Sequence, residues 1–171
     1  KDMGIVPGNR VLLRAPNNPM LAACWFAVMK AGAIAVATMP LLRAKELKAI
    51  IDIGRITHAL CDASLADELR LASSSLELRL FNTSGAGSLE AAMQRHDEPF
   101  TAVDTAADDT CLLAFTSGTT GVPKATMHFH RDLLAACRAW PRHVLRANQS
   151  DVFIGSPPLA FTFGLGGLLL F

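Results

Sequence analysis

Short apolar runs alternate with helix-like segments along the first 95 residues, and this alternation constrains the fold more than any other feature. The runs have the length and composition of buried strands and cover residues 11–15, 33–38, 57–61 and 76–81. Helices are predicted over residues 20–30, 42–54, 65–72 and 88–95. Repeats of this kind form right-handed βαβ units. The sequence therefore predicts an α/β fold, a layered parallel sheet with flanking helices.

Specific residues mark the expected helix starts. Asn18 offers a side-chain oxygen to free backbone amides, and the next residue is a proline that already has helical φ. Ser64, followed by Asp67, resembles a capping box for the third predicted helix. Ser88 is the expected cap of the fourth helix.

The alternation breaks over residues 96–110, which are acidic, contain Pro99 and are interpreted as a surface connection. We therefore expect two parts. Residues 1–103 form an α/β subdomain of strand–helix repeats. Residues 104–171 begin a second subdomain.

Three further elements are predicted in the second part. A helix over residues 131–140 is limited by Pro141, and its inward-facing side chains are expected to be Leu133, Leu134, Cys137 and Trp140. A short strand is predicted over residues 151–155, and a buried helix begins near residue 164. Because the chain starts without Met and stops in an apolar run, we expect a piece of a longer enzyme.

Composition excludes several functional classes. Sixteen Lys and Arg residues stand against fifteen Asp and Glu residues, a balance that gives no electrostatic case for nucleic acid binding. Residues 20–42 are mostly apolar, but Lys30 near their middle argues against a membrane span. The four cysteines are scattered and are expected to be buried free thiols. No secretory pattern is present, so the expected location is cytoplasmic.

The chemistry-bearing stretch is a loop of glycine and hydroxyl residues between two strand-like runs. It consists of Thr116, Ser117, Gly118, Thr119, Thr120, Gly121, Val122, Pro123 and Lys124. Glycines allow positive φ, so successive amides can turn inward and form a concave anion site, and Lys124 adds a cation. Such a loop suits a polyphosphate.

This loop does not have the Walker pattern. Pro123 stands where that pattern requires glycine, and Ala125 follows the lysine in place of Ser or Thr. The next residues, 126–129, are rich in the types favoured in strands, whereas a Walker loop opens a helix. The predicted local structure is strand, loop, strand.

The pattern T-S-G-T-T-G-x-P-K closely resembles the signature loop of the adenylate-forming enzymes, which include acyl- and aryl-CoA synthetases and the adenylation domains of peptide synthetases. The resemblance extends along the whole chain and implies part of the large N-terminal domain of such an enzyme. The residues 127–132 and 158–167 are most similar to the benzoate and 2-aminobenzoate CoA ligase branch. One departure is Ala125, where the family usually carries glycine.

The resemblance also implies an acyl pocket. In the family, a phrase similar to residues 158–164 supplies an aromatic gate and part of the acyl pocket, which here assigns Phe161, Thr162, Phe163 and Gly164. Phe161 stands where His is common, so an aromatic wall fits this sequence and a role for imidazole does not. The alternative is that both phenylalanines simply pack in the core.

Other catalytic sets are not evident in the sequence. His128 and His130 would share one face of a strand, but no clear third ligand lies nearby, and we favour a structural role over a metal site. No Ser-His-Asp set, G-x-S-x-G elbow or pair of carboxylates can be assembled.

The reaction implied by the resemblance is that of an ATP-dependent acid–thiol ligase. The expected substrate is an aromatic carboxylic acid such as a benzoate. Its carboxylate attacks the α-phosphate of Mg2+-ATP, and the thiol of coenzyme A then displaces AMP. The β,γ-phosphates would be held by Thr116, Ser117, Gly118, Thr119, Thr120 and Gly121, with Lys124 steadying the loop or contacting phosphate. The piece alone is expected to be inactive, and the intact enzyme could be a homo-oligomer. The alternatives are a peptide-synthetase adenylation domain, a kinase or ATPase with an unusual loop, and a non-catalytic domain.

Overall fold

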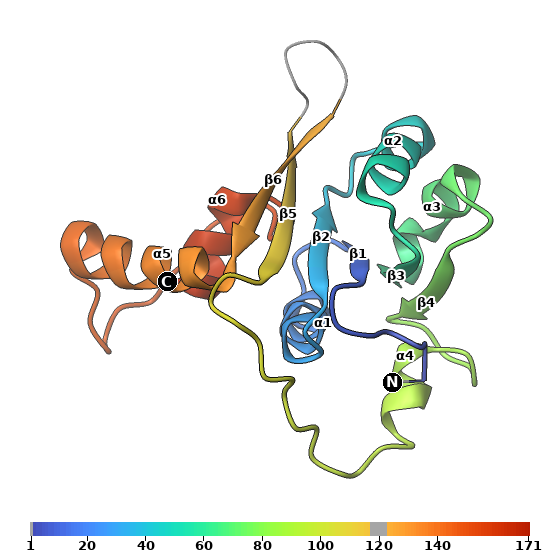
Figure 1. The fold of residues 1–171 in the computed structure, drawn as a ribbon, viewed down its shortest axis with the longest axis horizontal. Coiled ribbons are helices and arrows are strands. Elements are labelled where there is room, and N and C mark those ends of the chain that lie inside the picture. The colour runs from blue at the N-terminus through green and yellow to red at the C-terminus, as the bar shows by residue number, and fades with distance from the viewer. Residues whose placement is uncertain (1, 117–122) are drawn as a thin grey trace.

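The computed structural model describes residues 2–116 and 123–171 and contains one mixed sheet flanked by helices (Figure 1). The strands are β1 (Arg10–Arg14), β2 (Ile34–Thr38), β3 (His58–Asp62), β4 (Glu77–Phe81), β5 (Thr110–Thr116) and β6 (Lys124–Phe129). Their order across the sheet is β4-β3-β1-β2-β5-β6. Neighbours pair in parallel except β5 and β6, which are antiparallel. The predicted α/β fold with a parallel sheet is confirmed.

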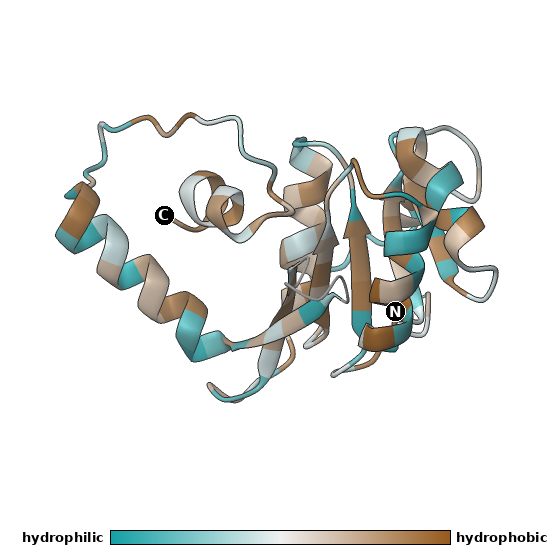
Figure 2. Ribbon diagram, turned by 90° about the horizontal axis from the view of Figure 1, so that it is seen from above, coloured by the Kyte–Doolittle hydropathy of each residue, from teal (hydrophilic) through white to brown (hydrophobic). Residues whose placement is uncertain are grey.

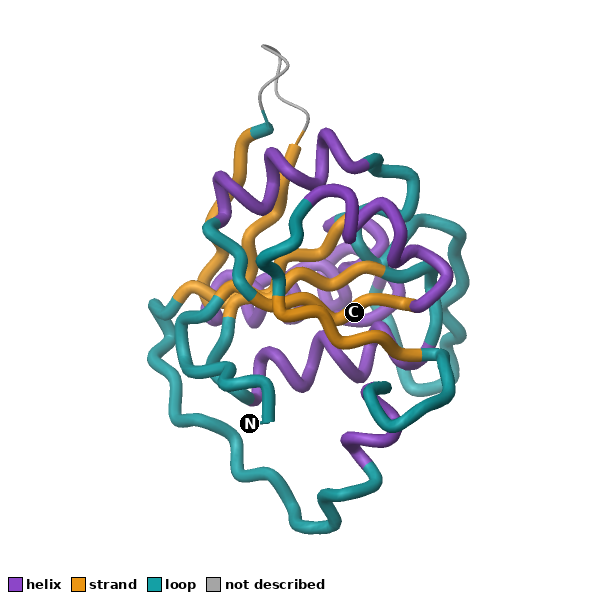
Figure 3. The backbone as a smooth tube through the Cα atoms, turned by 90° about the vertical axis from the view of Figure 1, so that its right-hand side faces the viewer, coloured by secondary structure: helices purple, strands orange, loops and turns teal. Residues whose placement is uncertain are grey.

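The helices cover both faces of the sheet, above and below the strands in Figure 3. They are α1 (Pro19–Lys30), α2 (Ala44–Gly54), α3 (Ala66–Ala72), α4 (Leu89–Met93), α5 (His130–Trp140) and α6 (Thr162–Leu165). Short turns of other helix types are η1 (Ala63–Leu65), η2 (Pro141–Leu145) and η3 (Gly166–Leu170). In the described part of the chain, no helix is both long and apolar enough to cross a membrane.

Alternation along the strands divides the core into two layers. Val11 and Leu13 of β1 pack in a cluster with Trp25 of α1, whereas Leu12 packs in the opposite cluster with Leu47 of α2. Side chains two residues apart share a face, so a strand covered on both sides is apolar throughout. The central strands are accordingly brown in Figure 2.

The expected helix starts are confirmed at two places and wrong at a third. Asn18 accepts from the Leu21 amide (2.8 Å), and Ser88 accepts from the Ala91 amide (3.1 Å). Ser64 does not cap α3. Asp62 at the end of β3 instead accepts from Ser64, and the turn η1 precedes the helix. The Asp62 carboxylate accepts from both the amide and the hydroxyl of Ser64, so this serine is held in η1 and does not cap α3.

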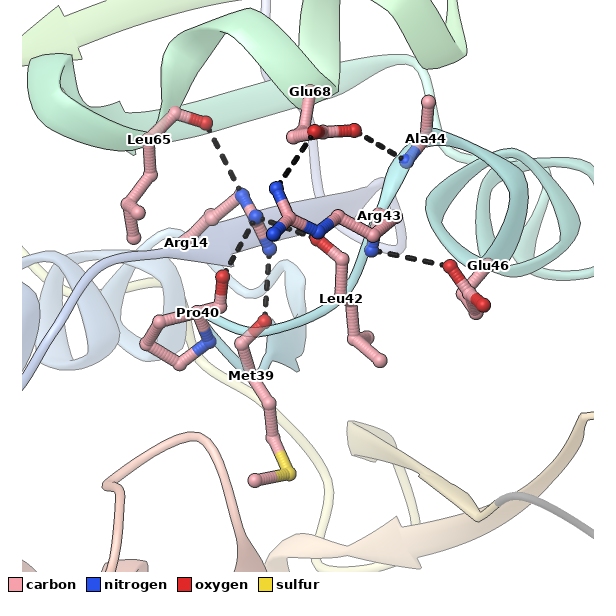
Figure 4. A network of polar contacts seen from close by, with 9 residues as sticks. All are labelled: Arg14, Met39, Pro40, Leu42, Arg43, Ala44, Glu46, Leu65 and Glu68. Carbon is pink, nitrogen blue, oxygen red and sulfur yellow. Dashed lines mark hydrogen bonds and ion pairs between the residues drawn. The ribbon is translucent and has the colours of Figure 1, made fainter.

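A buried arginine joins two crossover connections (Figure 4). Arg14 is 1% exposed, and its guanidinium donates to the carbonyls of Leu65 (3.2 Å), Met39 (2.8 Å), Pro40 (3.0 Å) and Leu42 (2.8 Å). Burial lowers the pKa of Arg14. Its donors thus link part-buried carbonyls of two irregular connections, of which the Met39 carbonyl also accepts from the Leu42 amide.

A glutamate of α3 holds the start of α2 beside this arginine. Glu68 accepts from the Ala44 amide (2.8 Å) and from the Arg43 side chain (3.0 Å). Both hydrogen bonds lower the pKa of Glu68, and the bond from the Ala44 amide has the larger effect. The helix N-terminus is therefore capped from a neighbouring helix.

The connection between α4 and β5 is mostly exposed, as predicted, but it is fixed near its middle. The Val103 amide donates to the Lys30 carbonyl (2.8 Å). Gly32, at φ +67°, lies against this valine, because a Cβ built on Gly32 would meet Val103 Cγ1 at 3.1 Å. A glycine is needed both for the left-handed turn after α1 and for this close approach.

The division into subdomains at residue 103 stays a prediction. The sheet itself runs across that position, because Leu112 of β5 pairs with Ala35 of β2.

Two predictions for residues 131–155 are wrong, and a third is confirmed. The confirmed one is the helix limited by Pro141, because α5 ends at Trp140 and the turn η2 begins at Pro141. On α5, Leu134 and Trp140 are expected to face inward but are 53% and 48% exposed, because the helix contacts the core mainly through Leu133. Residues 151–155 form no strand in the part of the chain that the structure describes, and their side chains are exposed. A strand requires a neighbour for its backbone hydrogen bonds.

Candidate functional site

The predicted phosphate loop joins the two strands of an antiparallel hairpin. Thr116, the last residue of β5, lies opposite Lys124, the first residue of β6, and both are exposed. A strand therefore precedes the loop and a strand follows it, as predicted. The remaining predicted phosphate ligands, Ser117, Gly118, Thr119, Thr120 and Gly121, lie outside the described residues.

A row of polar side chains follows Lys124 along one face of β6. Thr126 donates to the Ala114 carbonyl (3.3 Å) and lies 3.0 Å from His128 Nε2. Residues two apart on a strand share a face, so Lys124, Thr126 and His128 form one polar row. This row runs from the loop along the edge strand β6 toward the start of α5.

The second predicted histidine belongs to a different element. His130 is the first residue of α5, so it does not share a strand face with His128. Across the described residues there is no group of three or more His, Cys, Asp and Glu side chains that could hold a metal ion.

The predicted acyl-pocket residues lie in a folded turn at the start of α6. The Phe161 amide donates to the Pro158 carbonyl (2.9 Å), and Phe161 then accepts from the Leu165 amide (2.8 Å). Phe161 and Phe163 are 49% and 72% exposed, and Thr162 is also exposed. The alternative that both phenylalanines are plain core residues does not agree with this exposure.

Gly164 is buried beneath the chain that precedes it. A Cβ at this position would lie 2.2 Å from the Pro158 carbonyl oxygen and 2.7 Å from that of Pro157. Only a residue without a side chain allows this approach, so the turn and α6 are packed backbone against backbone.

The acyl-pocket segment packs against one face of β5, the first strand of the hairpin. Leu112 of β5 is the partner of His128, so it points to the face that carries the polar row. Leu112 also shares a core cluster with Leu165 of α6 and with Leu159. Figure 1 shows α6 beside β5 and β6. The structure thus places the start of α6 against β5, the strand that leads into the loop.

A buried polar cluster, missed by the sequence analysis, lies at the carboxyl end of the sheet. β1 and β3 are neighbours in the sheet. The chain continues from β1 to β2, toward one edge of the sheet, and from β3 to β4, toward the opposite edge, which creates a switch point between β1 and β3. Asp62, 6% exposed, accepts here from Asn18 (3.2 Å), Asn82 (2.6 Å) and the Ser64 hydroxyl (2.6 Å). The sequence signal that could have revealed this cluster is a polar residue, Asp62, at the end of a buried apolar run.

The charge of Asp62 is stabilised by this cluster. Burial acts to raise the pKa of Asp62, but the hydrogen bonds from Ser64, Asn82 and Asn18 outweigh it and lower the pKa. Both carboxylate oxygens have partners within the protein. The cluster is therefore a structural junction of three loops.

Three cysteines are unsuited to nucleophilic chemistry. Burial raises the pKa of Cys24 and of Cys61 to about 12, and that of Cys111 to about 11. A thiol is reactive as its thiolate, which these values disfavour. Together with Cys137 they are free cysteines, as predicted.

Two surface hollows lie away from the predicted site. One, of about 670 Å³, is lined by the ends of α2 and α3, including Lys48, Arg55 and Arg70. The other, of about 570 Å³, lies along α5 and η2 beside Arg138 and Arg142. Neither is lined by a predicted site residue.

Comparison with known proteins agrees with the fold and with the family resemblance. The family model described as AMP-binding enzyme matches residues 1–171. A benzoate–CoA ligase from Thauera aromatica is 28% identical over 173 residues, covering 99% of this chain and 33% of the relative. An anthranilate–CoA ligase from Pseudomonas aeruginosa is 34% identical over 177 residues, covering 96% of this chain and 32% of the relative.

A solved structure gives the same result in three dimensions. An anthranilate CoA ligase in complex with anthranoyl-AMP is similar with a TM-score of 0.88 and 28% identity, over 99% of this chain and 33% of that protein. The chain therefore spans about a third of the length of these proteins. The family match over the whole chain, the α/β sheet and the hairpin that joins Thr116 to Lys124 lead to one conclusion: this chain belongs to the AMP-binding enzyme family.

Proposed function

We propose that this chain is part of an ATP-dependent acid–thiol ligase that converts a carboxylic acid, ATP and coenzyme A into an acyl-CoA, AMP and pyrophosphate. The observation that carries the proposal is the β5–β6 hairpin. Its paired ends, Thr116 and Lys124, bracket the T-S-G-T-T-G-x-P-K pattern. The match to the AMP-binding enzyme family over residues 1–171 supports the same reaction class.

In the first step, a carboxylate oxygen of the acid attacks the α-phosphorus of ATP. The bond from this phosphorus to the bridging oxygen breaks, and pyrophosphate leaves. The loop residues 116–121 would bind the β,γ-phosphates through amides and hydroxyls, and Lys124 would place a positive charge at the same end of the hairpin. Such phosphoryl transfer depends on positioning and on neutralising the charge of the phosphate oxygens.

In the second step, the sulfur of coenzyme A attacks the carbonyl carbon of the acyl-adenylate. The carbon–oxygen bond to AMP breaks, AMP leaves, and the thiol proton is released. We assign no residue of this chain to that proton transfer. The raised pKa values of Cys24, Cys61 and Cys111 agree with a free coenzyme thiol as the nucleophile in place of a protein cysteine.

We further propose an aromatic acid as substrate, with Phe161 and Phe163 as walls of the acyl pocket. Both rings are exposed, so they are accessible to a ligand. The helix α6 packs through Leu165 in the same core cluster as Leu112 of β5. Aromatic faces pack well against an aromatic ring. Similarity to a benzoate–CoA ligase and to an anthranilate–CoA ligase supports the same substrate class.

Magnesium enters the proposal as the counter-ion of ATP. Because the described residues contain no group of carboxylates, histidines and cysteines able to hold a metal ion, no step is assigned to a protein-bound metal. Coenzyme A is a co-substrate.

The test is acid-dependent exchange of labelled pyrophosphate into ATP by the intact protein, with benzoate, 2-aminobenzoate and hexanoate as separate probes. The expected result is exchange that requires the acid, followed by release of AMP when coenzyme A is added. Production of ADP would identify a kinase or ATPase. Exchange without thioester formation would favour a peptide-synthetase adenylation domain, and no exchange with any acid would favour a non-catalytic domain.

A further inference from the structure

Asn17 holds the segment that leads into the candidate acyl pocket, although 140 residues of chain separate them. Its side-chain amide donates to the Pro157 carbonyl (2.9 Å), and its side-chain oxygen accepts from the Leu159 amide (2.7 Å). One carboxamide thus satisfies two backbone groups of the turn in the manner of a neighbouring strand. The side chain fixes both the position and the orientation of the turn.

Asn17 is itself held by its neighbour. Asn18 accepts from the Leu21 amide at the start of α1 and donates to the buried carboxylate of Asp62. These contacts fix the short connection between β1 and α1 on both sides. The loop that presents Asn17 is therefore a firm support.

The opposite side of the same segment is fixed by α6. Gly164 lies so close to Pro157 and Pro158 that a Cβ would meet their carbonyl oxygens at 2.7 and 2.2 Å. The turn is thus held between the carboxamide of Asn17 and the backbone of α6. A shift at residues 157–159 would move α6, and with it the aromatic rings of Phe161 and Phe163.

We propose that Asn17 is a positioning residue for the acyl pocket, which sets where the aromatic wall meets the carboxylic acid substrate. The inference rests on the proposed function, because it takes Phe161 and Phe163 as walls of that pocket. Asn17 contacts the supporting backbone and acts through it. Loss of Asn17 should therefore change the binding of the carboxylic acid and leave the binding of the ATP phosphates unaffected.

The bonds of Asn17 are exposed, so their loss should barely change global stability. Their loss would instead free the turn. A small displacement of a substrate-positioning group can lower the rate or the affinity by one or two orders of magnitude, on the order of 10² for a shift of about 1 Å. This difference separates positioning from a general role in folding.

The experiment compares Asn17→Leu with wild type in the intact protein. Leucine has the same branching at Cγ but neither donates nor accepts a hydrogen bond. The matched control is Asn9→Leu, which removes a carboxamide whose oxygen accepts from the Val6 amide in a local turn. Pyrophosphate exchange is measured with benzoate as the probe, and the KM values for benzoate and for ATP are determined separately.

The expected result is an increase of about tenfold in the KM for benzoate in Asn17→Leu, with the KM for ATP changed less than about twofold. Amide hydrogen exchange in a peptide covering residues 157–165 should become faster in the same variant. The Asn9→Leu control should change neither. Should Asn17→Leu fail to fold, Asn17→Asp, which keeps the acceptor for the Leu159 amide but loses the donor to the Pro157 carbonyl, should raise the KM for benzoate in the same selective way.

Two results would overturn the inference while leaving the proposed function intact. One is unchanged KM for benzoate and unchanged hydrogen exchange in Asn17→Leu. The other is a parallel rise in the KM values for benzoate and ATP. Failure of the wild-type protein to exchange pyrophosphate with any acid would overturn the proposed function, and the role of Asn17 in acid binding with it.

Discussion

Thr116 and Lys124 lie directly opposite each other at the ends of β5 and β6. The strand pairing therefore brings the first and last positions of the signature pattern together and places a cation beside the hydroxyl end of the loop. The chain continues from Lys124 as the strand β6, whereas a Walker loop is followed by a helix. Under the proposed function, the loop would bind phosphate through amides, hydroxyls and Lys124.

Thr119→Ala in the intact protein should slow acid-dependent pyrophosphate exchange by roughly 100-fold, because removing one well-placed donor to a developing charge costs about 3 kcal/mol. Thr101→Ala, in the exposed connection before β5, is the control and should exchange at the wild-type rate. An unchanged rate in Thr119→Ala would reject the role of this hydroxyl.

Phe163→Ala should raise the KM for benzoate by about tenfold, equivalent to about 1.4 kcal/mol of lost binding. The KM for ATP should stay the same. Because Phe163 is 72% exposed, the variant should remain folded. Leu71→Ala, at 76% exposure on α3, is a control of similar exposure away from the site. Equal effects of the two substitutions on benzoate would argue against an aromatic wall.

Arg14→Met should destabilise the protein by about 3 kcal/mol, since it removes the donors to four part-buried carbonyls in two connections. Arg14→Lys should recover only part of this loss, because one ammonium cannot reach four carbonyls at once. Urea unfolding of the intact protein measures both. Arg70→Met, which removes only an exposed contact with Asp67, should stay within about 0.5 kcal/mol of wild type.

Asp62→Asn should destabilise the protein most near neutral pH. The folded pKa of Asp62 is lowered, so the ionised carboxylate contributes stability that is present above its unfolded pKa, about 3.9, and is lost as pH falls through the folded value. The difference in urea midpoint between wild type and variant should therefore shrink below about pH 4. A difference that stays constant down to about pH 2 would show that the charge of Asp62 is not what the cluster stabilises.

The sheet could be predicted because its strands are short and apolar on both faces. Val11, Leu12 and Leu13 pack alternately into two core layers, a pattern that only a covered parallel strand requires. Local caps such as Asn18 could also be predicted, since the donor and acceptor lie within one turn. Register and long-range contacts could not be predicted this way.

The errors concern residues whose environment is decided by distant segments. Exposure of Trp140 depends on what packs against α5, which helical periodicity does not reveal. The sequence predicts Ser64 as a helix cap, but its hydroxyl donates to Asp62 and is not available for that role. Of the candidate site, the loop pattern was readable because its chemistry is local, whereas the contact of Asn17 with Pro157 is not a pattern in the sequence at all.

The contact between Val103 and the end of α1 has a thermodynamic consequence. It divides the long exposed run before β5 into two shorter spans, each with its own fixed ends. The entropy of closing a chain grows only with the logarithm of its length, so one anchor near the middle restricts the ensemble more than shortening the run would. Insertions on either side of Val103 should therefore be tolerated, while a larger residue at Gly32 would release both spans together.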